Sequence, residues 1–298
     1  MMRWLISILV FLFLLPGPAG AGQPLKVVAS FSILGDMVKN VGGDRVKLTT
    51  LVGPDSDTHA YEPTPTDARV LAAADVVIIN GLGFEGWIDR MVKTAGYKGK
   101  IIIASHGVKT HIMIDEDHGG KRIADPHAWQ DLANGRIYVT NIEQALSQAD
   151  PAGAGAFKAN AEAYMKKIAE METWVKAELA KIPPARRKII TSHDALGYFS
   201  LAYGVTIVAP MGFSTASEAS AQNVGKLIRQ IKREKITALF VENMTDPRLI
   251  ERIAKEAGAK SGGTLYSDAL SKPDAPGATY LEMFHNNVTK MTSAMATP

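Results

Sequence analysis

The chain has 298 residues, of which 46% are hydrophobic and 21% are charged, and its formal net charge is +3. These fractions are ordinary for a globular protein and exclude a mostly disordered chain. The length suffices for one large domain or for two domains of ordinary size, each with its own core. The small net charge gives no reason to expect a nucleic acid as partner.

The first residues have the features of a secretory signal peptide. Arg3 provides a short positive start, residues 4–15 form an apolar run, and small residues at Ala-x-Ala spacing end at Ala21. An apolar run this short is typical of a cleaved signal rather than of a membrane-spanning helix. We therefore expect residues 1–21 to be removed; a retained signal, the alternative, would leave a membrane tether.

The sequence contains no cysteine. It therefore offers no disulfide, no thiolate metal ligand and no cysteine for an acyl anchor. Export without such an anchor predicts a soluble protein, not membrane-spanning after signal cleavage, most simply in a bacterial periplasm. Nothing in the sequence indicates a stable oligomer, so we expect a monomer.

Strands and helices alternate along the first half of the chain. Short runs rich in β-branched residues predict strands at 25–30, 46–51, 75–80 and 100–104, and helical segments are predicted at 33–41, 67–74 and 87–95. This alternation is typical of βαβ units and a parallel sheet.

A long helix is predicted for 150–183. Asp150 suits its cap, Pro151 its first turn, and Pro183 its end. Apolar residues recur at spacings of four and three and form one stripe: Phe157, Ala161, Tyr164, Ile168, Met171, Val175, Leu179 and Ile182. A helix of about thirty residues is roughly 45 Å long, which suits a strut between two lobes. An ordinary long surface helix is the alternative.

The second half repeats the first, with strands predicted at 188–192, 205–209, 236–241 and 263–266. At an offset of 162, Lys26, Ser30, Leu34 and Gly35 match Lys188, Ser192, Leu196 and Gly197, and Ile88, Arg90, Ala95 and Gly96 match Ile250, Arg252, Ala257 and Gly258. Matches at one offset favour a duplicated lobe over chance similarity. The predicted fold is α/β, with two similar lobes, each a four-stranded, mostly parallel sheet flanked by helices. The predicted lobes are 22–150 and 184–298, joined by one long helix at 151–183.

Four polar residues follow predicted strands. His59 follows the second strand, His127 lies in the long loop after the fourth, His193 follows the first strand of the second half, and Asp268 follows the last. Ligands of parallel sheets bind beyond the carboxyl ends of the strands. Each lobe supplies two of these residues, so one metal ion held between the lobes is predicted; scattered loop residues are the alternative.

Five segments carry a resemblance to a known family: DTHAYEPTPTD, ADPHAW, TSHDALGYF, FVENMTDPR and YSDALS. With them the chain resembles, over essentially its whole mature length, the zinc- and manganese-binding solute-binding proteins of bacterial ABC importers (the cluster A-I family). The resemblance implies two lobes joined by one long helix and a membrane permease as partner. It also implies that His59, His127, His193 and Asp268 are the four metal ligands.

The type of ligand bears on which metal is bound. Zinc takes nitrogen together with oxygen in four-coordinate sites, whereas manganese prefers oxygen-rich sites of higher coordination. Three imidazoles and one carboxylate favour Zn(II), although Asp268 bound through both oxygens would make room for Mn(II). Members of the family with a carboxylate in place of His193 resemble manganese or iron binders, and this sequence departs from them there.

Other residues are assigned weaker roles. Glu62, Asp125, Asp194 and Glu242 are candidates for hydrogen bonds that orient the ligands. Trp129 either shields the site or belongs to the core. His111 and His118 lie in an acidic loop that resembles a shortened form of the His-rich loop of some zinc-binding members; a solvated loop is the alternative to weak metal capture. His106 and His285 are expected to be structural.

Three functions are compared. The first is a periplasmic, high-affinity metal-binding protein that delivers Zn(II) to a permease, with Mn(II) or Fe(II) on the same site as a variant. The second is a zinc hydrolase, which would need an open water position that four protein ligands close. The third is a binding protein for an organic solute, whose site would present arginines and aromatic platforms rather than imidazoles. The sequence favours the first, and no enzymatic activity is expected.

Overall fold

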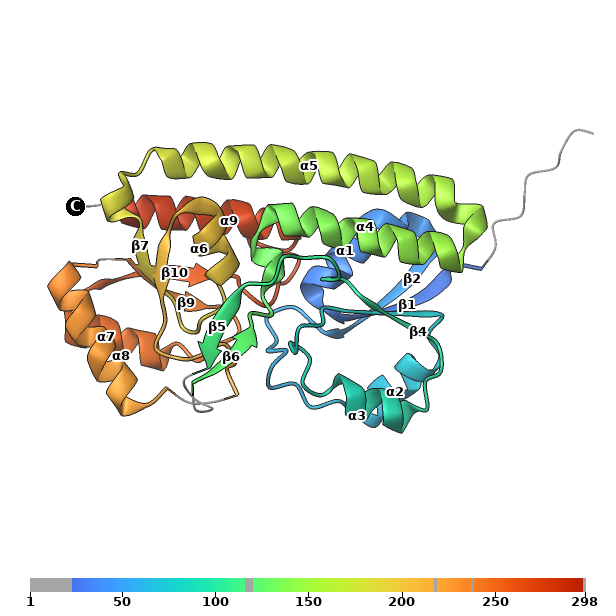
Figure 1. Ribbon diagram of the computed structural model, residues 1–298, viewed down its shortest axis with the longest axis horizontal. Coiled ribbons are helices and arrows are strands. Elements are labelled where there is room, and N and C mark those ends of the chain that lie inside the picture. Colours follow the sequence, from blue (N-terminus) through green and yellow to red (C-terminus); the bar gives the residue numbers. More distant parts are fainter. Residues whose placement is uncertain (1–22, 116–119, 217–218, 237, 297–298) are drawn as a thin grey trace, which may run out of the picture.

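The protein consists of two parallel-sheet lobes side by side, with one long helix lying across both (Figure 1). The structure is a computed structural model and describes residues 23–115, 120–216, 219–236 and 238–296. The predicted signal peptide and His118 lie outside these residues. In the described part of the chain, no helix has both the length and the apolar character needed to cross a bilayer.

The N-terminal lobe is built on four parallel strands in the order β2-β1-β3-β4. Its strands are β1 (Leu25–Phe31), β2 (Val46–Val52), β3 (Val76–Ile79) and β4 (Lys100–Ile103), and its helices are α1 (Ser32–Gly42), α2 (Pro65–Ala72) and α3 (Ile88–Ala95). All four side chains of β3 are buried, as expected of a continuous apolar run inside a parallel sheet. Every predicted strand overlaps an observed one.

The C-terminal lobe repeats this topology, with parallel strands in the order β10-β9-β7-β8. Its elements are β7 (Lys188–Ile190), α6 (Gly197–Tyr203), β8 (Thr206–Val208), α7 (Ala221–Glu234), β9 (Ala238–Glu242), α8 (Arg248–Ala257), β10 (Lys260–Leu265) and α9 (Tyr280–Ala296). The glycines that end α3 and α8, Gly96 and Gly258, both adopt the left-handed conformation that favours glycine. They are 162 residues apart, so backbone geometry repeats together with sequence. The two-lobed α/β fold is confirmed.

The long helix α5 (Ala154–Ala180) is somewhat shorter than predicted. Asp150 caps a short 3₁₀ turn, Pro151–Gly153, rather than α5 itself, since its carboxylate accepts from Gly153 N. Over the N-terminal lobe α5 packs on α1 and on α4 (Leu132–Ala149), and over the C-terminal lobe it packs on α9 (Figure 1). Residues of the predicted stripe from Phe157 to Leu179 are buried, apart from the partly exposed Met171. The helix is thus a strut that contacts both lobes.

The main hydrophobic core continues from one lobe into the other. Phe31 of β1, Ile168 of α5, Phe240 of β9 and Phe284 of α9 all belong to this one cluster of buried side chains. A second, smaller cluster lies between α7, α8 and the C-terminal sheet: Ile190, Leu227, Ile231, Ile236, Leu239, Ile250, Ile253 and Ala254. The lobes therefore share a core, and the boundaries 22–150, 151–183 and 184–298 stay a prediction.

Two features were not predicted: helix α4 and a hairpin. The stretch interpreted as an acidic loop contains an antiparallel hairpin, β5 (Ile112–Asp115) and β6 (Lys121–Ala124). Its period-2 pattern is short and interrupted by charge, which explains why it was missed. Because β6 ends at Ala124, the hairpin positions Asp125 and His127, which belong to the candidate site.

Candidate metal centre

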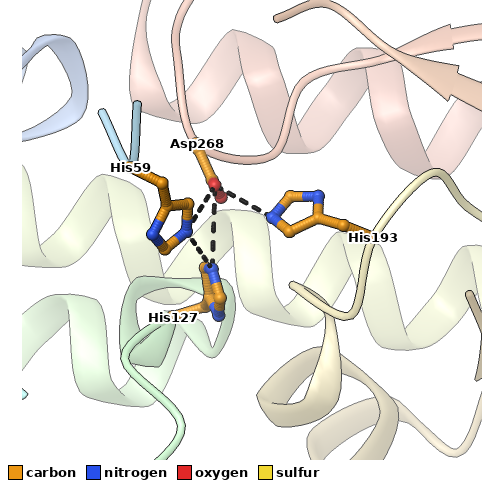
Figure 2. A group of neighbouring side chains, drawn as sticks. All are labelled: His59, His127, His193 and Asp268. Carbon is orange, nitrogen blue, oxygen red and sulfur yellow. Dashed lines mark hydrogen bonds and ion pairs between the residues drawn. The ribbon is translucent and has the colours of Figure 1, made fainter. Parts of the chain in front are cut away.

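Four side chains from separate loops converge between the lobes: His59, His127, His193 and Asp268 (Figure 2). One potential ligand atom from each lies within 4.8 Å of all the others. The Asp268 carboxylate is central, with Oδ2 at 3.0 Å from His193 Nε2, 3.4 Å from His59 Nε2 and 3.7 Å from His127 Nε2. The structure therefore brings together all four residues that the sequence singled out.

The cluster is sealed from solvent. The side chains of His127, His193 and Asp268 are fully buried, and that of His59 is 3% exposed. The aromatic ring of Phe84 lies 4.8 Å from the ring of His59, and Trp129 lies 5.4 Å from His127. Trp129 is itself completely buried against Phe84, so it both shields the cluster and belongs to the core.

Two of the three imidazoles, those of His127 and His193, are oriented by nearby carboxylates. His127 Nδ1 lies 2.8 Å from Asp125 Oδ1, which also accepts from the His127 backbone N–H. His193 Nδ1 approaches Glu242 Oε2 to 2.7 Å as an ion pair that is not aligned as a hydrogen bond, while Oε1 accepts from His193 N. Because the Nδ1 atoms of these two rings face the carboxylates, the Nε2 atoms of both rings point into the cluster. This is the arrangement by which proteins orient metal-ligating histidines.

The predictions for the orienting residues are half right. Asp125 and Glu242 are confirmed as partners of His127 and His193. Glu62 and Asp194 are wrong, because both are exposed and, in the described part of the chain, neither side chain forms a hydrogen bond or ion pair with a cluster histidine. The backbone N–H of Asp194 donates to Gly212 O, and Asp194 is not one of the four clustered residues.

The remaining described histidines lie outside the cluster. His106 is exposed, and its carbonyl accepts from Asn141 Nδ2. His111 packs its ring against Tyr198, whose hydroxyl accepts from His111 N. His285 stacks on Trp174 with ring centroids 4.6 Å apart. The structural role expected of His106 and His285 agrees with these contacts.

The charges in the cluster are strongly coupled. Burial opposes the charged form of His127, but the attraction of Asp268 and Asp125 outweighs it and raises the pKa of His127 to about 9. Burial likewise disfavours protonated His193, yet Glu242 and Asp268 raise its pKa well above the ordinary value. Burial also opposes ionisation of Asp268, but the two histidines hold its pKa well below the usual range. The pKa of His59 is lowered, chiefly by burial.

One carboxylate oxygen of the cluster lacks a hydrogen-bond partner among the described residues. Asp268 Oδ1 is buried and accepts no hydrogen bond from the described residues. An unsatisfied buried carboxylate oxygen costs free energy unless something else satisfies it. Three imidazole nitrogens and a carboxylate also match the donor set that zinc and related divalent ions prefer. The residues present therefore fit a divalent metal ion.

Sequence reasoning missed Asp57, although its signal was present. The pattern Asp-x-His occurs at 57–59 and again at 125–127. In both places the aspartate accepts from the histidine backbone N–H at 2.9 Å. Aspartate favours such turns because its side chain bonds its own backbone two residues on. The repeated pattern fixes the backbone of two candidate ligands.

Comparison with known proteins agrees with this geometry. The family model described as "ZnuA: Zinc-uptake complex component A periplasmic" matches residues 27–294. The manganese-binding lipoprotein MntA of Halalkalibacterium halodurans is 32% identical over 280 residues, covering 94% of this chain and 91% of the relative. The iron ABC transporter substrate-binding lipoprotein MtsA of Streptococcus pyogenes is 34% identical over 278 residues, covering 91% and 89%. The periplasmic zinc binding protein TroA of Treponema pallidum superposes with a TM-score of 0.86 at 28% identity, covering 92% and 99%.

Two parallel-sheet lobes under one long helix, with this likeness to ABC transporter components, define the class: a metal-binding substrate-binding protein of an ABC importer. Within that class, the chain belongs to the ZnuA family. Members of this family are transport proteins, so the chain is not an enzyme and the zinc hydrolase alternative is excluded. The family also implies a permease as partner and a location outside the cytoplasm.

Proposed function

We propose that the protein captures Zn(II) in the periplasm, after cleavage of residues 1–21, and delivers it to the permease of its importer. His59, His127, His193 and Asp268 are the proposed ligands. The observation that carries the proposal is the convergence of three Nε2 atoms and one carboxylate within 4.8 Å in a sealed site. Nitrogen-rich, four-coordinate sets of this kind favour zinc.

A second candidate, Mn(II) or Fe(II) on the same site, is supported by the unpartnered Asp268 Oδ1. A carboxylate that binds through both oxygens gives a fifth ligand atom, which suits these metals better than zinc. Relatives described as manganese-binding and as iron transporters point the same way. The coordination number therefore separates the two candidates.

Equilibrium measurements on untagged protein test the proposal. After removal of bound metal with a chelator, the protein is dialysed against Zn(II), Mn(II) or Fe(II) and its metal content is measured by mass spectrometry. We expect about one zinc per chain, and competition between Zn(II) and Mn(II) at equal free concentrations should leave zinc bound. Retention of manganese in that competition would establish the second candidate. Failure to bind any of the three ions would contradict the proposed function.

Metal affinity is expected to rise with pH up to about 9, beyond the ordinary histidine range near 6.5. Protonated His127 and His193 must lose their protons before Nε2 can coordinate, and the pKa values of both are raised. Near neutral pH, binding should therefore release about two protons. Titration calorimetry in buffers of different ionisation enthalpy measures this number. An affinity that is constant between about pH 7 and 9 would show that the histidines are not the groups displaced.

A further inference from the structure

The burial of the four clustered side chains restricts how a metal ion can reach them. Because the four side chains are at most 3% exposed, an ion cannot reach them unless part of the cover moves. His59 is the only one of the four that is not fully buried, so the candidate covers are the loop that carries it and a segment of the other lobe beside it. These are residues 53–60 of the N-terminal lobe and residues 211–216 of the C-terminal lobe.

Residues 211–216 lie beside His59 through Phe213 and are attached next to His193 through Met211 and Gly212. The ring of Phe213 lies 6.3 Å from the ring of His59. At the start of the segment, Met211 forms a bridge with His193, and Gly212 O accepts from Asp194 N. A movement of this segment would therefore uncover His59 while its beginning stays attached beside His193.

One carboxylate joins the two covering segments. Asp57 Oδ2 accepts from the hydroxyl of Thr215 at 2.6 Å, across the boundary between the lobes. Asp57 Oδ1 accepts from the backbone N–H groups of His59 at 2.9 Å and Ala60 at 3.3 Å. Asp57 thus links the segment that covers the site to the backbone of a proposed ligand.

A second contact holds the same loop in place independently of Thr215. Asp55 N donates to Leu270 O at 2.9 Å, and Asn243 Nδ2 donates to Asp55 Oδ1 at 2.8 Å. Asp55 has a φ of 53°, in the left-handed region that non-glycine residues seldom adopt. Since this anchor does not involve residues 211–216, the loop stays docked on the C-terminal lobe when the Asp57–Thr215 bond breaks.

A cavity of about 510 Å³ lies beside this bond, lined by Asp57, Ser192, Met211, Thr215, Met244 and Arg248 among others. Ser192 precedes His193, and Met244 Sδ lies 3.8 Å from the hydroxyl oxygen of Ser267, which precedes Asp268. At about 30 Å³ per water, the cavity exceeds the volume of a divalent ion with six waters. It therefore provides room for a hydrated ion next to the cluster.

From these contacts we infer that the Asp57–Thr215 hydrogen bond is a latch that sets how fast the metal ion enters and leaves through this cavity. Asp57 is then a positioning residue as well as one half of the latch. The inference rests on the proposed function, because it concerns the exchange of the ion that the four residues are proposed to bind. A latch of this kind alters both exchange rates and has little effect on their ratio.

Thr215→Val tests the latch, because it removes the hydroxyl but keeps the shape of the side chain. Association is followed by stopped-flow tryptophan fluorescence, for which Trp129 lies close to His127, and release by mixing the zinc-loaded protein with excess chelator. We expect both rates to rise about tenfold, as for loss of a hydrogen bond to a charged group, with an affinity within about threefold of the wild-type value. Thr206→Val, at an exposed position of β8, is the matched control and should change neither rate.

Two outcomes would overturn the latch. One is that Thr215→Val leaves both rates unchanged; the other is that only release becomes faster, which would mean that the bond stabilises the bound state without gating access. Asp57→Ala provides a second test: it should speed both rates and also weaken binding, because the His59 backbone loses its acceptor. In the Asp57→Ala protein, adding Thr215→Val should not change the two exchange rates further. If Thr215→Val still raised both rates tenfold there, Thr215 would not act through Asp57. A wild-type chain that binds no metal at equilibrium would instead refute the proposed function.

Discussion

Replacing His193 with alanine is expected to lower the affinity for zinc by about 100- to 1,000-fold. Four ligands share an apparent binding free energy of about 10–16 kcal/mol in structural zinc sites, so one ligand accounts for about 3–4 kcal/mol. The loss should fall near the upper end, because Glu242 would keep its charge but lose the imidazole that it orients. Competition with a chromophoric zinc chelator measures the change.

His106→Ala is the matched control for this substitution. It also removes one histidine, but from an exposed position outside the cluster, and should leave the affinity unchanged. Circular dichroism of both variants distinguishes loss of a ligand from loss of the fold. Near-normal zinc affinity in a folded His193→Ala protein would remove His193 from the ligand set.

Glu242→Ala is expected to lower the free energy of unfolding by about 3–5 kcal/mol, the usual cost of breaking a buried charged pair. This side chain is fully buried and accepts from the N–H groups of Ser192 and His193 and from the hydroxyl of Ser267. Truncation leaves all these donors without an acceptor. Since His193 also loses its orienting group, zinc affinity should fall by about 10- to 100-fold.

Two further variants give this prediction its controls. Glu242→Gln keeps an acceptor oxygen and should recover part of the stability but not the full affinity. Glu256→Ala removes a carboxylate that pairs with Arg252 on the exposed face of α8 and should change neither quantity. Urea unfolding of the metal-free proteins gives the stabilities. A Glu242→Ala protein as stable as the Glu256→Ala protein would show that the buried network is dispensable.

The fold was predictable from sequence because its signals are local and repeated. The four consecutive apolar residues of β3 predict a buried strand, and the apolar stripe on α5 predicts a helix; both patterns are local in sequence. The repeat at an offset of 162 residues then predicts that the two lobes are similar. The hairpin β5–β6 was not predicted, because two strands of four residues each are too short to show a clear alternation of apolar and polar residues. The shared core also escaped: nothing in the sequence around Phe284 indicates that α9 packs along α5.

For the candidate site, the residues themselves were predictable but most of their surroundings were not. The histidines and Asp268 stand at strand ends, where topology brings loops together. Glu242 is the last residue of β9 and so also stands at a strand end, whereas Asp194 directly follows His193 and lies outside the cluster. The contact between Asp57 and Thr215 joins residues 158 positions apart. Such a pair depends on how two loops meet across the lobes, and no local pattern encodes it.

The continuous core bears on selectivity. Lobes on a flexible tether would give up translational and rotational freedom each time an ion drew them together, at a cost of about 4 kcal/mol or more. In this protein that freedom is already lost on folding, because Ile168 and Phe284 are buried in a cluster that includes strands of both lobes. We therefore expect the four candidate donor atoms to keep nearly fixed positions. We also expect this rigidity to favour ions whose radius and coordination preference suit those positions, among metals whose intrinsic affinities for imidazole differ little.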